Sequence, residues 1–177
     1  MNLPRKVEEW HDRYRGISWN IRKWQTSTGE VKWNYYIYLN IEKIPEEYDP
    51  ESFWLECSEE GGYGYYKHPI IPIIEMHYGV TYYKKHLSDS FKYGKELRSI
   101  QIGCDYSHAW DDGESYNEQG ILVEVINTIN NVFKLMPEYK IWCNGCGQLF
   151  NSNEMTYKSE EKNYGYCKEC QERWGKK

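Results

Sequence analysis

The sequence predicts an α+β fold, in which an antiparallel sheet is covered by one long helix and followed by a small cysteine-rich finger. Three features predict it: two runs of alternating apolar and polar residues, one long run with apolar residues three and four positions apart, and two CxxC pairs near the C-terminal end. Alternation is typical of a strand with one buried face, whereas the three-and-four spacing is typical of an amphipathic helix. We expect an α+β body over residues 1–137 and the finger over residues 138–177.

Length and composition favour one packed domain with a small appendage. The chain has 177 residues, of which 40% are hydrophobic and 17% aromatic, so we expect a packed core and not disorder. Its longest apolar runs, such as residues 70–74, are far shorter than the roughly 20 residues needed to cross a bilayer. The first residues contain no apolar signal-peptide stretch, so we expect a soluble, cytoplasmic protein without a membrane partner. The formal net charge of −5 opposes non-specific binding to nucleic acid.

The first quarter of the chain predicts a short helix and then a β-hairpin. Residues 4–14 carry apolar side chains at helical spacing and a proline suited to a first turn, so we expect a helix there. Residues 17–22 and 33–41 alternate between apolar and polar side chains, on either side of the turn-like residues 26–29. This pattern predicts two antiparallel strands that bury the same face.

The middle of the chain predicts short elements separated by loops. An Asp-Pro pair opens residues 49–55, which we expect to form a short helix, and the glycine- and tyrosine-rich residues 58–66 predict a loop. Residues 76–83 and 99–106 are expected to form two further strands. The polar residues between these strands predict an excursion from the sheet.

The clearest helix signal follows residue 114. Ser115 and Glu118 have the spacing of a capping box, and apolar residues then recur three and four positions apart through Met136. Pro137 cannot continue a helix, so it marks its end and the start of the finger. We expect the apolar stripe of this helix to lie across the sheet.

The finger is predicted to bind one structural zinc ion. Two CxxC pairs are separated by twenty residues, and a CxxC pair in a tight turn presents two sulfurs to one tetrahedral metal. Gly145 and Gly147 flank a cysteine where such a turn needs a positive φ. Four protein ligands leave no open position, so we expect a structural metal in a treble-clef or zinc-ribbon finger, not four unrelated buried cysteines. The predicted ligands are Cys143, Cys146, Cys167 and Cys170.

Two short segments of the body carry histidine and aspartate at the edges of expected strands. If those strands pair, the four side chains could converge into a site for metal binding, acid-base chemistry or polar-ligand recognition. The alternative is that these residues cap loops and satisfy buried backbone groups. Cys104 lies within an apolar strand pattern, which favours a buried residue over a nucleophile. The four candidate catalytic residues are His77, Asp105, His108 and Asp111.

The same segments resemble a family of small bacteriophage and prophage proteins. The resemblance covers roughly residues 60–135 and rests on an HP motif at His68, the HYGVTY motif at residues 77–82, the GCDYSH motif at residues 103–108, and a following helix that contains Glu124. In that family two glycines more often follow the histidine that corresponds to His77. In this sequence Tyr78 takes the first of those two places. The resemblance implies an origin in a mobile element. His68, Tyr82 and Tyr106 are candidate ligand-binding residues.

Three functions remain open from the sequence. We favour a phage-encoded accessory protein that is not an enzyme and that binds a host protein or a nucleotide-type ligand in the host cytoplasm to blunt host defence. The first alternative is a metal-dependent hydrolase or nuclease that uses the four candidate catalytic residues. The second is a nucleic-acid-binding accessory protein that uses the finger, although its lysine and arginine residues are interspersed with glutamate.

Overall fold

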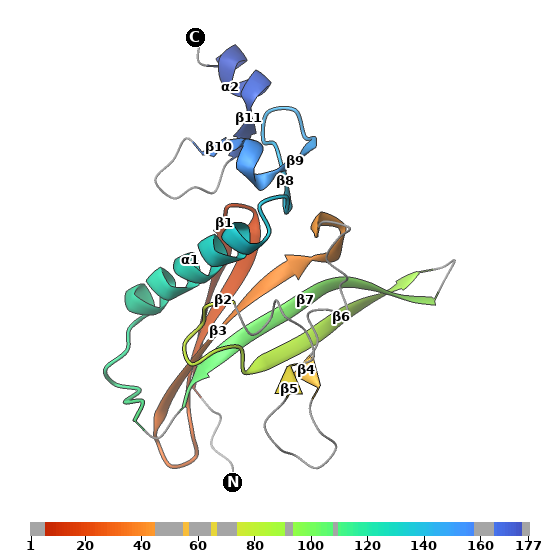
Figure 1. Cartoon of the computed structure of the whole chain (residues 1–177). Helices are drawn as coiled ribbons and strands as arrows, with labels where there is room; N and C mark the ends of the chain where they lie inside the picture. Colours follow the sequence, from red (N-terminus) through yellow and green to blue (C-terminus); the bar gives the residue numbers. More distant parts are fainter. Residues whose placement is uncertain are drawn as a thin grey trace.

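The main sheet contains five antiparallel strands in the order β1-β2-β3-β7-β6 (Figure 1). The computed structural model describes residues 6–44, 55–56, 65–66, 74–90, 94–107, 110–157 and 165–174. The five strands are β1 (Val7–Tyr14), β2 (Ile17–Gln25), β3 (Val31–Asn40), β6 (Tyr82–Ser90) and β7 (Gly94–Tyr106). The helix α1 (Glu118–Leu135) packs against β2 and β3. The expected combination of an antiparallel sheet, a helix and a C-terminal cysteine cluster is therefore confirmed.

The two faces of this sheet differ in chemistry. Because side chains alternate along a strand, the register places one set of apolar residues on the face that meets α1. The other face carries polar and aromatic side chains, among them Asn20, Tyr36 and Gln101. The expected β2–β3 hairpin is confirmed, with its turn at residues 26–29. The buried residues of the α1-facing side are Tyr14, Ile17, Trp19, Ile21, Val31, Trp33, Tyr35, Ile37, Leu39, Ile100, Ile102, Cys104 and Tyr106.

The predicted helix over residues 4–14 is wrong, because residues 7–14 form β1. Val7, Trp10 and Tyr14 have helical spacing, but β1 pairs with β2 over its whole length and uses the alternate residues Trp10 and Tyr14 toward the core. The link to β2 is a two-residue turn in which Arg15 and Gly16 both have positive φ, at 49° and 81°. Such turns match the twist of a hairpin, and this one overrides the helical pattern.

The prediction for residues 76–106 is partly wrong. The segment before β6 forms a turn that includes the hydrogen bond from Gly79 N to Met76 O, and β6 begins only at Tyr82. The polar residues expected to leave the sheet instead extend both strands, β6 to Ser90 and β7 back to Gly94. Edge strands commonly carry charged side chains. These charges obscure the alternation of apolar and polar residues that would otherwise predict a strand.

Within the described residues, two short strands lie between β3 and β6. The 3₁₀ turn η1 (Ile41–Lys43) follows β3, and β4 (Leu55–Glu56) pairs with β5 (Tyr65–Tyr66). Leu55 is therefore in a strand and not in the helix expected over residues 49–55. Residues 65–66 also form a strand, although a loop was expected over residues 58–66. The remaining parts of those two predictions lie outside the described residues.

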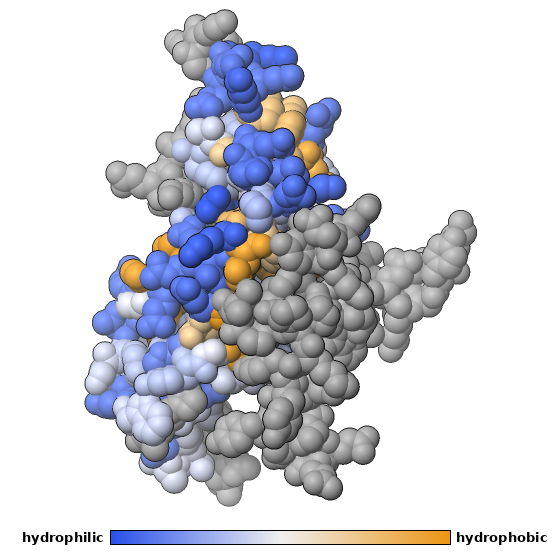
Figure 2. Space-filling model, in the orientation of Figure 1, coloured by the Kyte–Doolittle hydropathy of each residue, from blue (hydrophilic) through white to orange (hydrophobic). Residues whose placement is uncertain are grey.

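The N-cap of helix α1 lies two residues later than predicted. Asn117, not Ser115, is the N-cap, and its side chain accepts a hydrogen bond from Gly120 N. Ser115 instead donates to Asp112 in the preceding turn. The predicted apolar stripe is buried, and in the described part of the chain no helix is both long and apolar enough to cross a membrane. Hydrophilic residues dominate the outer side of α1 (Figure 2).

The finger consists of two small hairpins and a helix. The first hairpin is β8 (Lys140–Trp142) with β9 (Leu149–Asn151), the 3₁₀ turn η4 (Ser152–Glu154) follows, and the second hairpin is β10 (Met155–Tyr157) with β11 (Gly165–Cys167). The chain then enters α2 (Lys168–Trp174).

Arg15 joins the finger to the body. From the β1–β2 turn, its guanidinium lies 4.2 Å from the centroid of the Phe133 ring on α1 and 5.1 Å from that of Tyr157 in β10. It also donates a 3.0 Å hydrogen bond to Asn130. Tyr139 and Ile141, which follow the end of α1, are buried in the same core as the sheet. These contacts hold the finger against one end of the body.

A substitution at Gly103 should test the packing of the polar face. A Cβ atom at this position would lie 2.4 Å from Tyr35 O and 2.4 Å from the Tyr36 ring, which packs edge-on against Tyr82. We expect Gly103→Ala to lower the free energy of unfolding by about 1–3 kcal/mol in urea titrations. Gly120→Ala is the matched control, because its nearest contact is an ordinary 3.5 Å, and it should not destabilise the protein. Equal stability of the two variants would contradict this account of the sheet.

Candidate functional site

The four finger cysteines lie close enough together to hold one metal ion. Their sulfur atoms are all within 4.8 Å of one another, and the Sγ atoms of Cys146 and Cys167 are 4.0 Å apart. Four thiolates around a tetrahedral metal, each about 2.3 Å from it, have sulfur separations of this size. None of the four forms a disulfide.

The backbone around the first pair forms a tight turn that aims both sulfurs inward. Gly147 has φ +69°, and its N–H donates to Cys143 O at 2.8 Å. The Cys143 sulfur accepts hydrogen bonds from Gly145 N and Cys167 N, both at 3.3 Å. A Cβ atom on Gly145 would lie 2.7 Å from the Cys170 sulfur, so this position needs glycine for the two pairs to meet.

The protonation of these thiols depends on whether a cation lies between them. Burial opposes ionisation of Cys143, but the backbone N–H groups that donate to its sulfur lower its pKa to about 6. Burial and the neighbouring thiol groups raise the pKa of Cys170 to about 12. Without a cation the four sulfurs cannot all be thiolates at neutral pH, because like charges at these distances repel. A divalent metal removes that conflict.

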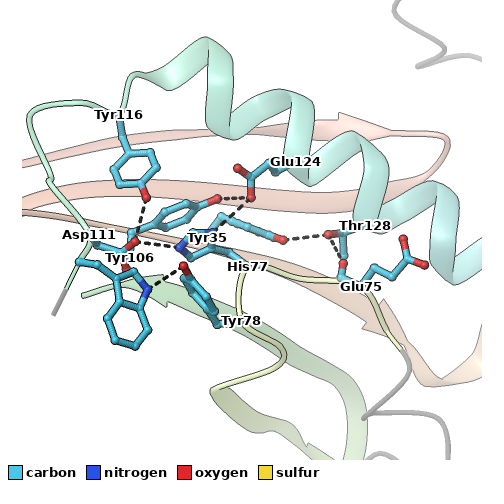
Figure 3. A network of polar contacts seen from close by, with 10 residues as sticks. Tyr35, Glu75, His77, Tyr78, Tyr106, Asp111, Tyr116, Glu124 and Thr128 are labelled. Carbon is cyan, nitrogen blue, oxygen red and sulfur yellow. Dashed lines mark hydrogen bonds and ion pairs between the residues drawn. The ribbon is translucent and has the colours of Figure 1, made fainter. Parts of the chain in front are cut away.

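A second cluster lies between α1 and the sheet and is centred on His77 (Figure 3). One ring nitrogen, Nε2, is 3.1 Å from Asp111 Oδ1, and the other, Nδ1, is 3.9 Å from Glu124 Oε2. The Asp111 side chain is only 1% exposed, and it also accepts a 2.8 Å hydrogen bond from Tyr116 OH. The imidazole stacks on the Tyr106 ring, with centroids 4.0 Å apart.

Hydrogen bonds from tyrosine hydroxyls extend this cluster along α1. Tyr106 OH donates to Glu124 Oε2 at 2.6 Å, and Tyr35 OH is 2.8 Å from Thr128 Oγ1. Thr128 in turn donates to Glu75 O at 2.7 Å (Figure 3). The network therefore ties β3 and β7 to α1 and to the segment before β6.

The outer end of the network carries two exposed aromatic side chains. Trp110 is 71% exposed and Tyr78 is 57% exposed, and Trp110 Nε1 donates a 2.6 Å hydrogen bond to Tyr78 OH. Tyr78 packs edge-on against His77, with centroids 4.4 Å apart. Its φ of +53° lies in the left-handed region, which residues other than glycine rarely adopt. Such backbone strain in a non-glycine residue is typical of functional sites.

The candidate catalytic residues are divided between the two faces of the sheet. His77 and Asp111 are in contact beneath α1. Asp105 lies on the opposite face, because it precedes Tyr106 on β7, and it accepts hydrogen bonds from Thr81, at 2.8 Å, and from Ser107. His108 lies outside the described residues. Asp105 therefore does not take part in the His77 network.

The candidate ligand-binding residues do not line one pocket either. Tyr106 is buried on the α1 side, whereas Tyr82 packs against Tyr36 on the other side of the sheet. His68 lies outside the described residues. In the part of the chain that the structure describes, the four finger cysteines are the only group of three or more side chains placed to bind a metal.

Sequence reasoning missed several members of the network, although some signal was present. Glu124 is a charged residue between Ile121 and Val125 of the apolar stripe, which is a position that calls for a buried partner. Tyr35 and Tyr116 were indistinguishable from the many other tyrosines until the register was known. Comparisons of the chain with family models, with curated proteins and with solved structures find no match.

The buried hydroxyl and thiol groups predict a loss of stability at alkaline pH. Burial raises the pKa of Cys104 to about 12, and burial followed by the hydrogen bond to Glu124 raises the pKa of Tyr106 above its usual value. An unfolded tyrosine ionises near pH 10, so between pH 10 and 12 unfolding releases protons that the folded protein retains.

We therefore expect these two groups to leave the free energy of unfolding unchanged below about pH 8 and to lower it as the pH rises toward 12. Each such group should contribute up to about 1.4 kcal/mol per pH unit. Urea titrations at several pH values measure this slope, which Tyr106→Phe should reduce. A flat profile up to pH 12 would contradict the assignment of these groups as buried and neutral.

Proposed function

We propose that this chain is a phage-type accessory protein without catalytic activity, which binds and inhibits or sequesters a component of the host cytoplasm. The observation that carries the proposal is the exposed pair of Tyr78 and Trp110, held from below by a buried polar network. Tyrosine and tryptophan dominate the binding energy of protein interfaces, and rigid presentation lowers the entropy lost on binding. The resemblance to phage proteins supports a host protein as the partner.

The geometry around His77 supports binding over catalysis. A general base needs a nitrogen that can reach a substrate proton, but both ring nitrogens of His77 face carboxylates. Asp111 is likewise enclosed by His77 and Tyr116. The metal-dependent hydrolase of the first alternative would require a metal site, and in the described residues only the finger offers one.

The metal in the finger is proposed to be zinc with a structural role. Four sulfur ligands suit zinc, and a closed set of four leaves no position for a substrate. The first CxxC pair lies in a turn between β8 and β9, whereas Cys167 ends β11 and Cys170 lies in the first turn of α2. This order of knuckle, hairpin and helix favours a treble-clef finger over a zinc ribbon.

The finger could also contact nucleic acid, which is the remaining alternative. On α2, exposed Lys168 and Arg173 are interspersed with exposed Glu169 and Glu172. A mixed surface of this kind gives weak attraction for phosphates. Retention on DNA or RNA that falls with salt and is lost on replacing Lys168, Arg173 and Lys176 would favour this function.

The zinc proposal predicts one zinc per chain. Elemental analysis of the purified protein should find this stoichiometry, and Cys146→Ser should lose it, whereas Cys104→Ala should retain it because Cys104 lies in the body. Removing the metal with a chelator should unfold the finger, since few apolar contacts replace the metal there. Absence of stoichiometric zinc in the wild-type protein would contradict the proposal.

The partner proposal predicts that Trp110→Ala abolishes capture of a host protein. The tagged wild-type protein should retain one host protein from a lysate, in an amount nearly equal to its own. The variant should not retain it, because Trp110 supplies an anchor of the contact. Val123→Ala is the matched control, since Val123 is 57% exposed on α1 and its truncation should leave capture unchanged. Neither change should alter stability by more than about 0.5 kcal/mol.

Two outcomes would count against this function. The first is capture that is equally strong with Trp110→Ala and with the wild-type protein. The second is turnover of nucleotides or nucleic acids with divalent metals that is lost in a folded His77→Asn protein. The latter would favour the hydrolase alternative.

A further inference from the structure

A groove crosses the face of the sheet that points away from α1. It consists of two adjoining hollows of about 590 and 500 Å³, which share Arg13, Ser18 and Tyr38. The register places Arg13 opposite Ser18 and Ser18 opposite Tyr38, so the three side chains form one row across β1, β2 and β3. The second hollow continues past Lys43 to Trp142 at the base of the finger. Each hollow is within the range of small-molecule sites, about 300–1,000 Å³.

Lys43 is the most informative residue of this groove. The residue is only 8% exposed, yet within the described part of the chain no carboxylate lies within ion-pair distance of its amine. Burial, and next the charge of Arg13, lower its pKa, against a smaller opposing effect of Glu42. The stem of this side chain is buried, but its amine opens into the hollow and is not among the buried side-chain atoms that lack a hydrogen-bond partner. An anion entering the hollow would pair with this ammonium group.

The other lining groups suit a planar, hydroxylated ligand. Trp142 is 52% exposed at the finger end, where its ring is available for stacking. Ser18, Asn40 and Ser99 supply hydroxyl and amide groups to the same hollow. The second hollow therefore combines positive charge, an aromatic surface and neutral polar groups, whereas Glu9 and Asp12 line only the first hollow.

We propose that this groove binds a nucleotide-type ligand, with its phosphate group on Lys43 and Arg13 and its base stacked on Trp142. The ligand can be a free nucleotide or the end of a single-stranded nucleic acid, since both present a phosphate beside a planar base. The site lies on the opposite face from Tyr78 and Trp110. It is therefore independent of the protein-binding function proposed above.

Isothermal titration of the full-length, zinc-loaded protein tests the site directly. The probes are ATP, adenosine, inorganic phosphate and a short single-stranded oligonucleotide. ATP should bind at least about tenfold more tightly than adenosine, because adenosine lacks the charged group that pairs with Lys43. Tighter binding of the oligonucleotide than of ATP would identify a nucleic-acid end as the source of the ligand, and the reverse order would identify a free nucleotide.

Variants separate a ligand-binding lysine from a structural one. Lys43→Met keeps the buried stem but removes the charge, so it should weaken ATP binding about tenfold or more and leave the melting temperature without ligand unchanged or higher. Trp142→Ala should also weaken binding. Lys140→Met is the matched control, because Lys140 is exposed on the same strand as Trp142 and does not line the groove. Trp110→Ala should bind ATP as the wild-type protein does.

Three results would overturn the proposal. These are no saturable binding of ATP or the oligonucleotide by the wild-type protein at millimolar concentration, equal affinity of Lys43→Met and the wild type, and an equal loss of affinity in Lys140→Met. A fall in melting temperature for Lys43→Met with unchanged affinity would assign the lysine to folding alone. Capture of a host protein in any of these cases would leave the first function intact.

Discussion

A carboxylate buried beneath a helix must be paired, and this requirement organises the body of the protein. The Asp111 side chain is 1% exposed and is satisfied by His77 and by Tyr116, which come from opposite ends of the chain segment that contains β6 and β7. Losing either donor would remove one of the hydrogen bonds that compensate this buried carboxylate, which is destabilising. The segment that carries His77 is therefore fixed between α1 and the sheet, and Tyr78 is held in its left-handed conformation at the surface.

The alternation of side chains along the strands gives the protein two separate surfaces. On the α1 side, the apolar residues form the core and the network ends in the exposed pair of Tyr78 and Trp110. On the other side, polar and aromatic residues remain at the surface and form the groove that contains Lys43. Since neighbouring residues such as Asp105 and Tyr106 point to opposite sides, a ligand on one surface does not contact the other.

Local patterns in the sequence were sufficient for the helix α1, the β2–β3 hairpin and the cysteine cluster. Each of these depends on residues that are close in the sequence or on a ligand spacing. The edge strands β1 and β6 could not be predicted in this way, because an edge strand is only partly buried and its charged residues obscure the alternation. Because side chains alternate along a strand, the apolar residues Ile102, Cys104 and Tyr106 were sufficient to predict that Asp105 lies on the opposite face. Choosing a partner for His77 required the tertiary structure.

The finger is joined to the body through Arg15, Tyr139 and Ile141. The protein therefore offers two surfaces to a partner, the aromatic pair on the body and the finger. Hydrogen exchange followed by mass spectrometry, with and without the captured host protein, distinguishes these surfaces most directly. A partner bound by the aromatic pair should slow exchange in residues 76–80 and 110–116 and leave α2 unchanged. Protection confined to residues 165–174, with none around Tyr78 and Trp110, would contradict the account.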